Sequence, residues 1–538
     1  MEDFERCYRA VQSRDARFDG WFFTAVTSTR IYCRPSCPAK TPKPANVRFY
    51  PTAAAAQQAG FRACLRCRPD AAPGSPEWLG RADVAARAVK LILDGTVDRD
   101  GVTGLARRLG YSERQLHRVL VAEVGTGAVA LARAQRAQTA RLLLETTGLP
   151  VAEVAFAAGF ASVRQFNDTV KEIFARTPTE LRLAAGSRRT PPSRGPLGRP
   201  PGTTAGVSAC TTPALSLRLA HRRPLAAGPL LGFLAARAVP GVESCDGTTF
   251  RRSLRLAHGD GTVELTPAEG YIAATFRLSD LRDLTTAVAR CRQLCNLDAD
   301  PVAVDEALGA DPLIGGLVRA VPGRRVAGAA DGFELAVRAV VGQQVSVEGA
   351  RTVIGRLVAA AGSRLSHPDG EVTHTFPSAV AVAELAARRP EAFPMPERRR
   401  RALAALAEEV AADRLTIDPG ADPRRLEEGL MAIPGIGPWT ASYVAMRALG
   451  DPDAFLPTDL GARRAVEALG QPGDPAHLAA LAERWRPWRA YALAHLWSLD
   501  GAPTAAATTS TEQRTTGVPT SRRTTSGADP TDIGESAA

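Results

Sequence analysis

Three things are scarce or missing in this sequence, and each restricts what the protein can be. No apolar run reaches the ~18 residues that a membrane-spanning helix needs, so we expect no membrane partner. Cysteine occurs in an odd number, nine, which argues against a disulfide framework and favours a metal site with ordinary thiols. Lysine is rare, and its positions are Lys40, Lys43, Lys90 and Lys171. Arginine therefore carries almost all of the positive charge.

Length and positive charge are what the chain does have. Its 538 residues exceed what one hydrophobic core usually organises, so we expect roughly three or four domains. The net charge of +11 and the isoelectric point near 9.5 suit a polyanionic partner, because each cation that pairs with a phosphate releases counterions. The mixed and charged start, Met1–Ala10, is not typical of a signal peptide.

Composition and periodicity change along the chain and predict six segments. The segment 186–212 is rich in Pro, Gly, Ser and Arg and reads as a flexible linker. In order, the segments are 1–78 (Cys-rich), 79–185 (helical), 186–212 (linker), 213–300 (alternating strand patterns to about Leu278), 301–500 (helical) and 501–538 (Thr, Ser, Gly and Ala rich, expected to be disordered).

Four of the cysteines form one tight pattern near the N-terminus. Cys33 and Cys37 are separated by three residues, 26 residues follow, and Cys64 and Cys67 are separated by two. Two such close pairs can complete a tetrahedral Zn(Cys)4 site, so we expect one Zn2+ there. Spacing alone favours a zinc that only holds a small domain together.

The residues around these cysteines carry more information than the spacing. The stretches WFFTAVTSTRIYCRPSCPAK, NVRFY and AGFRACLRCRPD resemble the N-terminal domain of the Ada adaptive-response methyltransferases over about 70 residues. The resemblance implies that Cys33 accepts a methyl group from a DNA methylphosphotriester, once and without turnover. A zinc-bound thiolate remains deprotonated and nucleophilic. Methylation would remove one negative charge and could raise DNA affinity as a switch.

Basic residues near this site are candidates for phosphate contact. Arg34 directly follows Cys33, and Lys40, Lys43 and Arg66 lie close in sequence. The alternative for each is an ordinary solvated surface charge.

Two helix-turn-helix patterns lie about 50 residues apart. In the first, VTGLARRLGYSERQLHRVL at 102–120, Gly110 marks the turn, and Ser112 with Gln115 forms a capping box that starts a helix. In the second, VAEVAFAAGFASVRQFNDTV at 151–170, Gly159 and Ser162 take these places. A long helix, about Val129–Thr146, is expected between them. The pair resembles the AraC-family DNA-binding domain over about 100 residues.

The resemblance implies that the second helix of each unit lies in the major groove of promoter DNA. Arginine reads guanine and Gln or Asn reads adenine, although phosphate contacts are the commoner kind. The candidates are Arg114, His117, Arg118, Arg164, Gln165 and Asn167. We expect Phe156, Phe160, Phe166 and Phe174 to be core residues. This half resembles a methylation-activated transcription factor, whose expected partner is RNA polymerase.

The C-terminal half contains a glycine hairpin before a helix, IPGIG at 433–437. Gly435 and Gly437 let the backbone approach DNA closely, and amides at the following helix start can bind a phosphate. With the helical DPRRLEEGLMAI before it, this is a helix-hairpin-helix pattern. Glycine turns between helices are common, so the hairpin alone is a moderate signal.

An aspartate follows the hairpin by about 20 residues, Asp459 in FLPTDLGARR. From Pro213 to Asp500 the chain resembles the helix-hairpin-helix glycosylases of the AlkA type, the 3-methyladenine DNA glycosylases II. The resemblance implies that Asp459 is the catalytic carboxylate, because glycosidic cleavage builds positive charge on the deoxyribose. One alternative is that Asp459 only caps a helix. Another is that Asp451 or Asp453 is the catalytic carboxylate, although the sequence around these two residues indicates a loop.

The same resemblance implies an aromatic pocket for an extruded, positively charged base. Its expected residues are Trp439, Tyr443 and Trp497, with Gln343 and Gln344 on the opposite wall. Gln344 stands where an apolar residue is expected, which affects base preference. Trp485 and Trp488 are expected in the core, as are the thiols Cys291 and Cys295.

Three absences exclude particular reactions or cofactors. Bifunctional relatives use a lysine Schiff base just after the hairpin, but Trp439 stands there and no lysine follows Lys171. No cysteine follows Cys295, so the iron–sulfur cluster that some relatives carry on C-terminal cysteines is excluded. The PCHR motif of the O6-alkylguanine acceptor domain is also absent, so we expect no direct reversal of O6-methylguanine.

The expected fold is multidomain and mainly α. It comprises a small α/β zinc module, an all-α double helix-turn-helix domain, a small α/β subdomain and an all-α helix-hairpin-helix glycosylase domain. The predicted function is alkylation repair by a monofunctional glycosylase joined to a self-methylating regulator, in the bacterial cytoplasm on double-stranded DNA. The alternative is a transcription factor with a purely structural zinc and an inactive glycosylase-like module.

Overall fold

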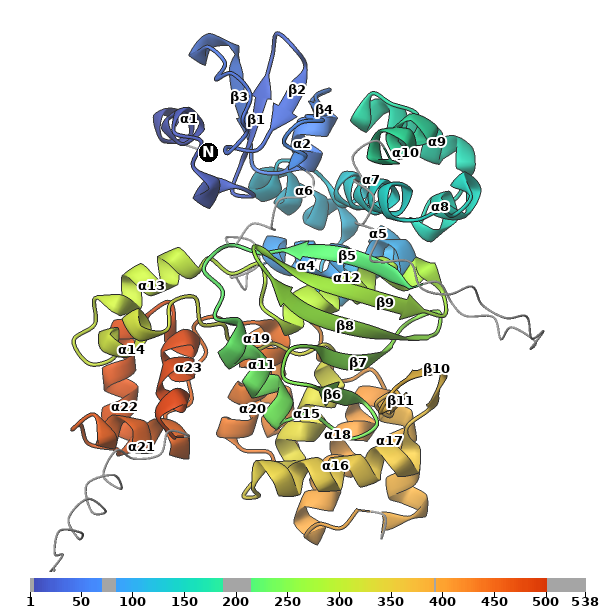
Figure 1. The fold of residues 1–538 in the computed structure, drawn as a ribbon. Helices are drawn as coiled ribbons and strands as arrows, with labels where there is room; N and C mark the ends of the chain where they lie inside the picture. Colours follow the sequence, from blue (N-terminus) through green and yellow to red (C-terminus); the bar gives the residue numbers. More distant parts are fainter. Residues whose placement is uncertain (1–3, 70–83, 187–213, 391–392, 501–538) are drawn as a thin grey trace, which may run out of the picture. The chain divides into compact units, whose positions relative to one another are not determined.

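The architecture follows the predicted sequence of a sheet module, a helical region, a second sheet and a second helical region (Figure 1). The computed structural model describes residues 4–69, 84–186, 214–390 and 393–500. The predicted linker, the predicted C-terminal tail and the boundary at 78/79 lie outside these residues, apart from Gly186, which ends a helix. In the described part of the chain, no helix combines the length and apolar character needed to cross a membrane.

The N-terminal module is a four-stranded sheet in the order β3-β1-β2-β4. Strand β2 pairs in parallel with β4, so that Tyr32 lies opposite Ala63. This parallel pairing places Cys33, the last residue of β2, beside the chain that continues from β4 into Cys64. The elements are α1 (Phe4–Gln12), β1 (Phe23–Val26), β2 (Ile31–Cys33), β3 (Val47–Tyr50), α2 (Ala53–Gln58) and β4 (Arg62–Ala63).

Seven helices lie in the described residues 84–186, and two of them begin at the predicted N-caps. Ser112 caps its helix with a complete capping box to Gln115, and Ser162 caps the second such helix. Gly110 and Gly159 have φ of 77° and 84°, a left-handed conformation that glycine adopts without strain. The helices are α4 (Val84–Leu93), α5 (Thr96–Leu109), α6 (Glu113–Val124), α7 (Ala128–Thr146), α8 (Val151–Ala157), α9 (Val163–Phe174) and α10 (Pro178–Gly186).

One core prediction in this region is wrong. Phe160, Phe166 and Phe174 are buried as expected, but Phe156 is 51% exposed. The buried stripe of α8 runs through Val154, Ala155 and the residues three and four positions on, and Phe156 lies off that stripe. Its place on the helix therefore decides its exposure, whatever its apolar character.

The second sheet has five antiparallel strands in the order β5-β9-β8-β7-β6. Alternate residues of β9 are buried, which is the pattern that predicted strands here. Helix α11 interrupts the predicted run of strands. Helix α12 carries the buried thiol Cys291, and the buried Cys295 is its C-cap residue, which confirms both as core residues. The elements are β5 (Leu215–Ala220), α11 (Ala227–Ala236), β6 (Glu243–Cys245), β7 (Phe250–Arg255), β8 (Asp260–Ala268), β9 (Tyr271–Leu278) and α12 (Leu284–Leu294).

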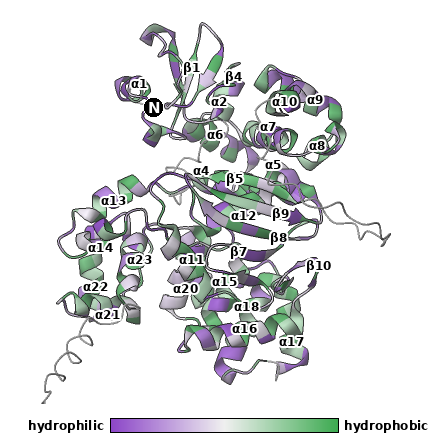
Figure 2. Ribbon diagram, viewed as in Figure 1, coloured by the Kyte–Doolittle hydropathy of each residue, from purple (hydrophilic) through white to green (hydrophobic). Residues whose placement is uncertain are grey.

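The C-terminal helices surround two apolar clusters, and Tyr443 packs against both. Figure 2 shows hydrophobic and hydrophilic residues interspersed along these helices. A hairpin, β10 (Arg364–Asp369) with β11 (Val372–His374), was not predicted. The helices are α13 (Pro301–Gly309), α14 (Gly315–Ala320), α15 (Gly332–Val341), α16 (Val347–Ala361), α17 (Ala379–Arg388), α18 (Glu397–Ala411), α19 (Pro423–Met431), α20 (Pro438–Val444), the π-helix η6 (Ala445–Leu449), α21 (Leu460–Ala468), α22 (Pro475–Ala482) and α23 (Arg489–Asp500).

A buried ionic cluster joins the five-stranded sheet to α15. Arg252 on β7 donates to Glu243 at 3.1 Å and to Glu334 at 2.8 Å, and all three side chains are at most 5% exposed. Arg338 on α15 donates to Glu243 at 2.7 Å. Each charge has an opposite partner, which burial of charge requires.

We expect Arg252→Met to destabilise the protein by roughly 3–5 kcal/mol, because it removes one of the two arginines that pair with the buried carboxylates of Glu243 and Glu334. Arg255→Met is the matched control on the same strand: its ion pair with Asp331 is 3.1 Å long, the arginine side chain is 41% exposed, and its loss should cost at most about 1 kcal/mol. Calorimetric unfolding of the full chain measures both. Equal stability of the two variants would contradict the prediction.

Candidate functional site

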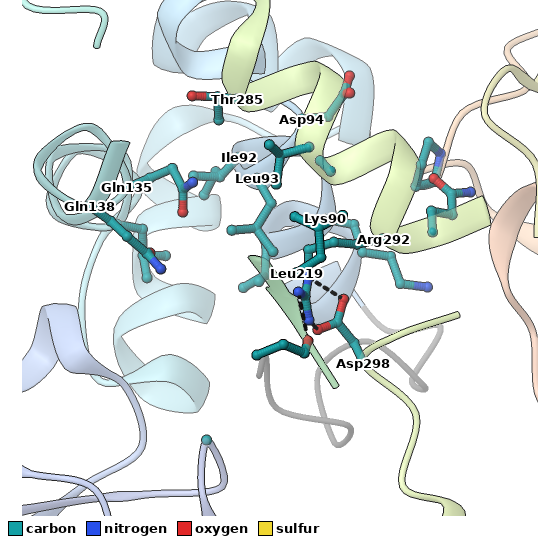
Figure 3. Close-up of a pocket in the computed structure, with 18 of the residues that line it drawn as sticks. Lys90, Ile92, Leu93, Asp94, Gln135, Gln138, Leu219, Thr285, Arg292 and Asp298 are labelled. Atoms are coloured by element: carbon teal, nitrogen blue, oxygen red, sulfur yellow. Dashed lines mark hydrogen bonds and ion pairs between the residues drawn. The ribbon is translucent and has the colours of Figure 1, made fainter. Parts of the chain in front are cut away.

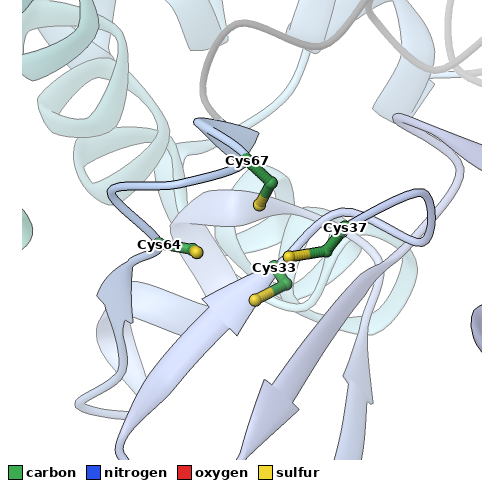
Figure 4. A group of neighbouring side chains, drawn as sticks. All are labelled: Cys33, Cys37, Cys64 and Cys67. Carbon is green, nitrogen blue, oxygen red and sulfur yellow. The ribbon is translucent and has the colours of Figure 1, made fainter. Parts of the chain in front are cut away.

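The four predicted cysteines come together in one cluster (Figure 4). Their sulfur atoms all lie within 4.8 Å of one another. Cys64 and Cys67 are buried, whereas Cys33 and Cys37 are half-buried. The hydrogen bond from Cys64 N to Tyr32 O, 3.0 Å, continues the β2–β4 pairing up to the cluster.

The donor set of this cluster fits a zinc ion. Contact with Cys37 is the largest effect that raises the pKa of the Cys33 thiol, because neighbouring thiols oppose their joint ionisation. Four thiolates can be held together only by a cation, and four cysteine sulfurs in a tetrahedral arrangement are a usual ligand set for structural Zn2+. The cluster is therefore a site for one zinc ion, as the spacing predicted.

The loop between the first two cysteines is held by a buried carboxylate. Asp19 accepts from Ser36 N at 3.0 Å and from Ser36 Oγ at 2.6 Å. Its Oδ2 also lies 3.4 Å from Arg34 Nη1, and the Arg34 side chain is 32% exposed. Arg34 therefore stands beside Cys33 in a fixed orientation. Lys40, Lys43 and Arg66 are exposed.

The predicted DNA-reading residues lie on the second helix of each helix-turn-helix unit and are all exposed. Arg114, His117 and Arg118 are on α6, and Arg164, Gln165 and Asn167 are on α9. The His117 ring also lies against Gly127, where an added Cβ would come within 2.5 Å of its Nδ1.

The predicted hairpin connects α19 to α20. Gly435 has φ of 99°, which favours glycine, and an added Cβ would lie 3.1 Å from the Ala402 Cβ. Gly437 is the N-cap residue of α20. Gln343 donates from its Nε2 to Gly435 O at 3.2 Å and to Thr440 Oγ1 at 3.0 Å, so it braces the hairpin.

Gln344 follows in the turn between α15 and α16. It is exposed, and its φ of 55° lies in the left-handed region. The two predicted glutamines therefore differ: the amide of Gln343 is engaged by the hairpin, whereas the Gln344 side chain is presented to solvent.

Asp459 is almost fully buried, at 8% exposure, and its carboxylate accepts hydrogen bonds from three N–H groups. Its Oδ1 accepts from Ala462 N at 2.9 Å and from Trp497 Nε1 at 2.8 Å, and its Oδ2 accepts from Trp439 Nε1 at 3.0 Å. The residue is thus the N-cap of α21, as one interpretation of the sequence predicted, and its carboxylate also contacts two of the predicted aromatic residues; its catalytic role stays a prediction. These donors stabilise a negative charge on the carboxylate.

The rival aspartates are loop residues, as expected. Asp451 Oδ1 accepts from Asp453 N at 2.9 Å, and Asp453 Oδ1 accepts from Arg489 Nε at 2.8 Å.

The three predicted aromatic residues, Trp439, Tyr443 and Trp497, join Phe233 in what we call the aromatic cluster. Both tryptophans of this cluster also donate to Asp459. Trp439 and Tyr443 are stacked with centroids 5.2 Å apart and planes at 9°. Trp497 lies 6.4 Å from Tyr443 at 56°. Trp485 is 1% exposed and Trp488 is half-buried against the same apolar cluster, as predicted for core residues.

Sequence reasoning missed three residues of this site. Phe233 on α11 lies 6.4 Å from Trp497 at 18°. The guanidinium of Arg237 lies 3.8 Å from the Phe233 centroid, and that of Arg447 lies 4.8 Å from it. Phe233 and Trp497 are more than 250 positions apart, so no local pattern points to their contact.

A cavity of about 450 Å3 lies elsewhere, lined by parts of α4, α7, β5 and α12 among others (Figure 3). Gln135 and Gln138 lie on one side, and Arg292, whose Nε is 3.2 Å from Asp298 Oδ2, lies on another. The residues that line it include none of the predicted site residues.

Three family models match the chain. The metal binding domain of Ada matches residues 6–70, a helix-turn-helix domain matches 105–184, and the AlkA N-terminal domain matches 216–331. These matches and the cysteine cluster confirm the predicted zinc module and the mainly α, multidomain fold.

Some curated relatives match nearly the whole chain, and others match only its N-terminal or its C-terminal half. A Mycobacterium tuberculosis protein, "probable bifunctional transcriptional activator/DNA repair enzyme AlkA", is 54% identical over 92% of this chain and 96% of its own length. The Escherichia coli DNA-3-methyladenine glycosylase 2 is 35% identical over 51% of this chain and 93% of its own. The E. coli bifunctional transcriptional activator/DNA repair enzyme Ada is 33% identical over 32% of this chain and 48% of its own.

We expect the purified full chain to contain about one zinc ion, and Cys67→Ser to lose it, because three thiolates leave the tetrahedral site incomplete. Metal analysis after dialysis measures this. Cys295→Ser is the matched control, since that thiol is buried far from the cluster in sequence and should not affect zinc content. A Cys67→Ser protein with the wild-type zinc content would show that the cluster does not bind the metal.

Proposed function

The chain belongs to the family of bifunctional Ada/AlkA-type transcriptional activator and DNA repair proteins, and from this we propose that it excises alkylated bases through Asp459 and records DNA methylation on Cys33. The observation that carries the first proposal is the Asp459 carboxylate, held by two indole N–H groups within the aromatic cluster. The half-buried position of Cys33 in the four-cysteine cluster supports the second.

We propose that the C-terminal half is a monofunctional 3-methyladenine DNA glycosylase of type II. The bond between C1′ of the deoxyribose and the base nitrogen breaks, and the base departs with the bonding electrons. Positive charge develops on the sugar, where the Asp459 carboxylate stabilises it. Water then adds to C1′ and releases a proton, which Asp459 or solvent accepts. The absence of lysine after Lys171 supports hydrolysis without a Schiff base.

The damaged base must leave the duplex stack to react. We propose that it binds against Trp439, Tyr443 and Trp497, because electron-rich ring faces attract the positive charge of an alkylated purine. Gly435 and Gly437 in the hairpin, which Gln343 braces, would place the backbone against a DNA phosphate. Gln344 stands exposed beside this surface and is the candidate to contact the duplex.

The methyl-acceptor proposal is a single transfer. The Cys33 sulfur attacks the methyl carbon of a methylphosphotriester, an S–C bond forms, the C–O bond breaks, and an ordinary phosphodiester anion leaves. Bound zinc supplies a thiolate that is deprotonated at neutral pH. Arg34, oriented by Asp19, is placed to contact the phosphate next to the methyl group.

The regulatory proposal follows from the two helix-turn-helix units. Their exposed candidates on α6 and α9 would read promoter bases, and loss of one negative charge at the cysteine cluster would strengthen DNA binding. We infer that RNA polymerase is the partner through which the bound protein acts on transcription. We also propose that 1–78, 79–185, 213–300 and 301–500 are the domains of the protein, joined by the linker 186–212 and followed by the tail 501–538, and that the protein works on the chromosome in the cytoplasm.

Asp459→Asn should reduce release of 3-methyladenine from methylated duplex DNA by at least about 100-fold, because the amide cannot stabilise the sugar cation. Asparagine also caps helices well, so the fold should remain intact. Asp451→Asn is the matched control and should release bases at the wild-type rate. Single-turnover release measured by chromatography tests both, and a fully active Asp459→Asn protein would refute the assigned mechanism.

Incubation with a duplex that carries methylphosphotriesters should add one methyl group to the protein, located on Cys33 by peptide mass mapping. The physical reason is that Cys64 and Cys67 are buried and so cannot reach the substrate. An unmethylated duplex is the control and should leave the mass unchanged. Methylation of Cys37 instead, or none at all, would contradict the assignment.

A further inference from the structure

Arg447 is a buried cation without a carboxylate partner among the described residues. It is 7% exposed, and it donates to three oxygens: Ala327 O at 2.7 Å, Gly328 O at 2.8 Å and the Tyr443 hydroxyl at 2.7 Å. Burying a guanidinium on neutral acceptors alone is unfavourable. A charge kept in such a place suggests a role other than stability.

The local backbone is built to hold this guanidinium against Tyr443. Arg447 lies in the π-helix η6, a rare element that is frequent at functional sites. It is four positions after Tyr443, close enough for contact along one helical face. The segment that carries its carbonyl partners passes so close to α12 that a Cβ on Gly328 would lie 2.3 Å from Gln293 O.

The aromatic cluster therefore has charges of opposite sign at its two ends. At one end, the guanidiniums of Arg447 and Arg237 lie 4.8 Å and 3.8 Å from the Phe233 centroid. At the other end, the indole N–H groups of Trp439 and Trp497 hold the Asp459 carboxylate.

Tyr443 connects the two ends. Its hydroxyl accepts from Arg447, and its ring stacks on Trp439. Burial alone would raise the pKa of Tyr443, but the nearby guanidiniums of Arg447 and Arg237 outweigh it and lower that pKa. The phenol oxygen therefore draws electron density toward the cationic end, away from Asp459.

We propose that Arg447 is a positioning residue that, through Tyr443, forms the positive end of an electric field across the aromatic cluster, opposite Asp459. This rests on the glycosylase proposal and deepens it. During bond cleavage, positive charge moves from the alkylated base to the deoxyribose, and the base becomes less positive by one unit. A fixed cation on the base side repels the charged base before cleavage, and a carboxylate on the sugar side attracts the charge after it.

This arrangement assists the chemical step at the expense of substrate binding. Only interactions that are more favourable in the transition state than in the bound substrate accelerate the reaction. Removing the cation should therefore slow cleavage while leaving the binding of a cationic base unchanged or stronger. A residue that only supported the fold would instead weaken binding and cleavage together.

The test uses the full chain and a duplex with a single 7-methylguanine, a stable cationic purine. We expect Arg447→Met to lower the single-turnover rate of base release at least about tenfold, with a half-saturating protein concentration equal to or below that of wild type. Arg447→Lys, which keeps the charge, should retain more of the rate. Arg325→Met is the matched control, because Arg325 is also buried and donates to backbone carbonyls, but it makes no contact with the aromatic cluster.

Tyr443→Phe tests the route through the hydroxyl and keeps the proposal falsifiable if Arg447→Met does not fold. It should lower the rate without raising the half-saturating concentration, and in its background Arg447→Lys should cause little further loss. An unchanged rate, or a rate and a half-saturating concentration that worsen together, would overturn the proposal. If the wild-type protein itself released no base, the glycosylase proposal would fail first, which the Asp459→Asn comparison distinguishes.

Discussion

Charge that is held away from water must be compensated, and this constraint shapes both functional centres of the protein. In the zinc module, four sulfur atoms within 4.8 Å of one another can be thiolates together only around a cation. In the glycosylase half, the nearly buried Asp459 carboxylate is stable because three N–H groups from α20, α21 and α23 converge on it. The buried ionic cluster between the sheet and α15 follows the same rule with carboxylates and guanidiniums.

The two centres handle alkylation by opposite electrostatic means. At the cysteine cluster, concentrated negative charge would make Cys33 the proposed nucleophile toward a methyl group on a neutral triester, and the transfer would reduce that charge. In the aromatic cluster, the proposed substrate already carries positive charge, and the protein would need only to stabilise that charge as it moves to the sugar. A single-use acceptor suits a signal, because its product persists, whereas a hydrolytic site can act repeatedly.

Each centre is positioned by local backbone geometry. The parallel pairing of β2 with β4 brings Cys33 to Cys64, and the 3.0 Å bond from Cys64 N to Tyr32 O extends it to the metal site. In the glycosylase half, the helix cap at Asp459 and the start of α20 after Gly437 set the positions of the carboxylate and of Trp439. Local structure thus carries the reactive groups, and side chains from distant elements complete their surroundings.

The sequence alone determined the features that depend on near neighbours. The cysteine spacing, the capping box at Ser112, the N-cap at Ser162, the hairpin glycines and the alternation in β9 all arise within a few residues, where hydrogen bonding and periodicity act directly.

Only the tertiary structure decided the contacts that join distant segments. It placed Phe233 against Trp497, directed both indole N–H groups to Asp459, held Arg447 on Tyr443 and two carbonyl groups, and left Phe156 exposed. Helix α11 and the β10–β11 hairpin were also not predicted from the sequence. The reason is physical: such contacts depend on how separate elements pack, and the pattern within one element carries no information about which face another will cover.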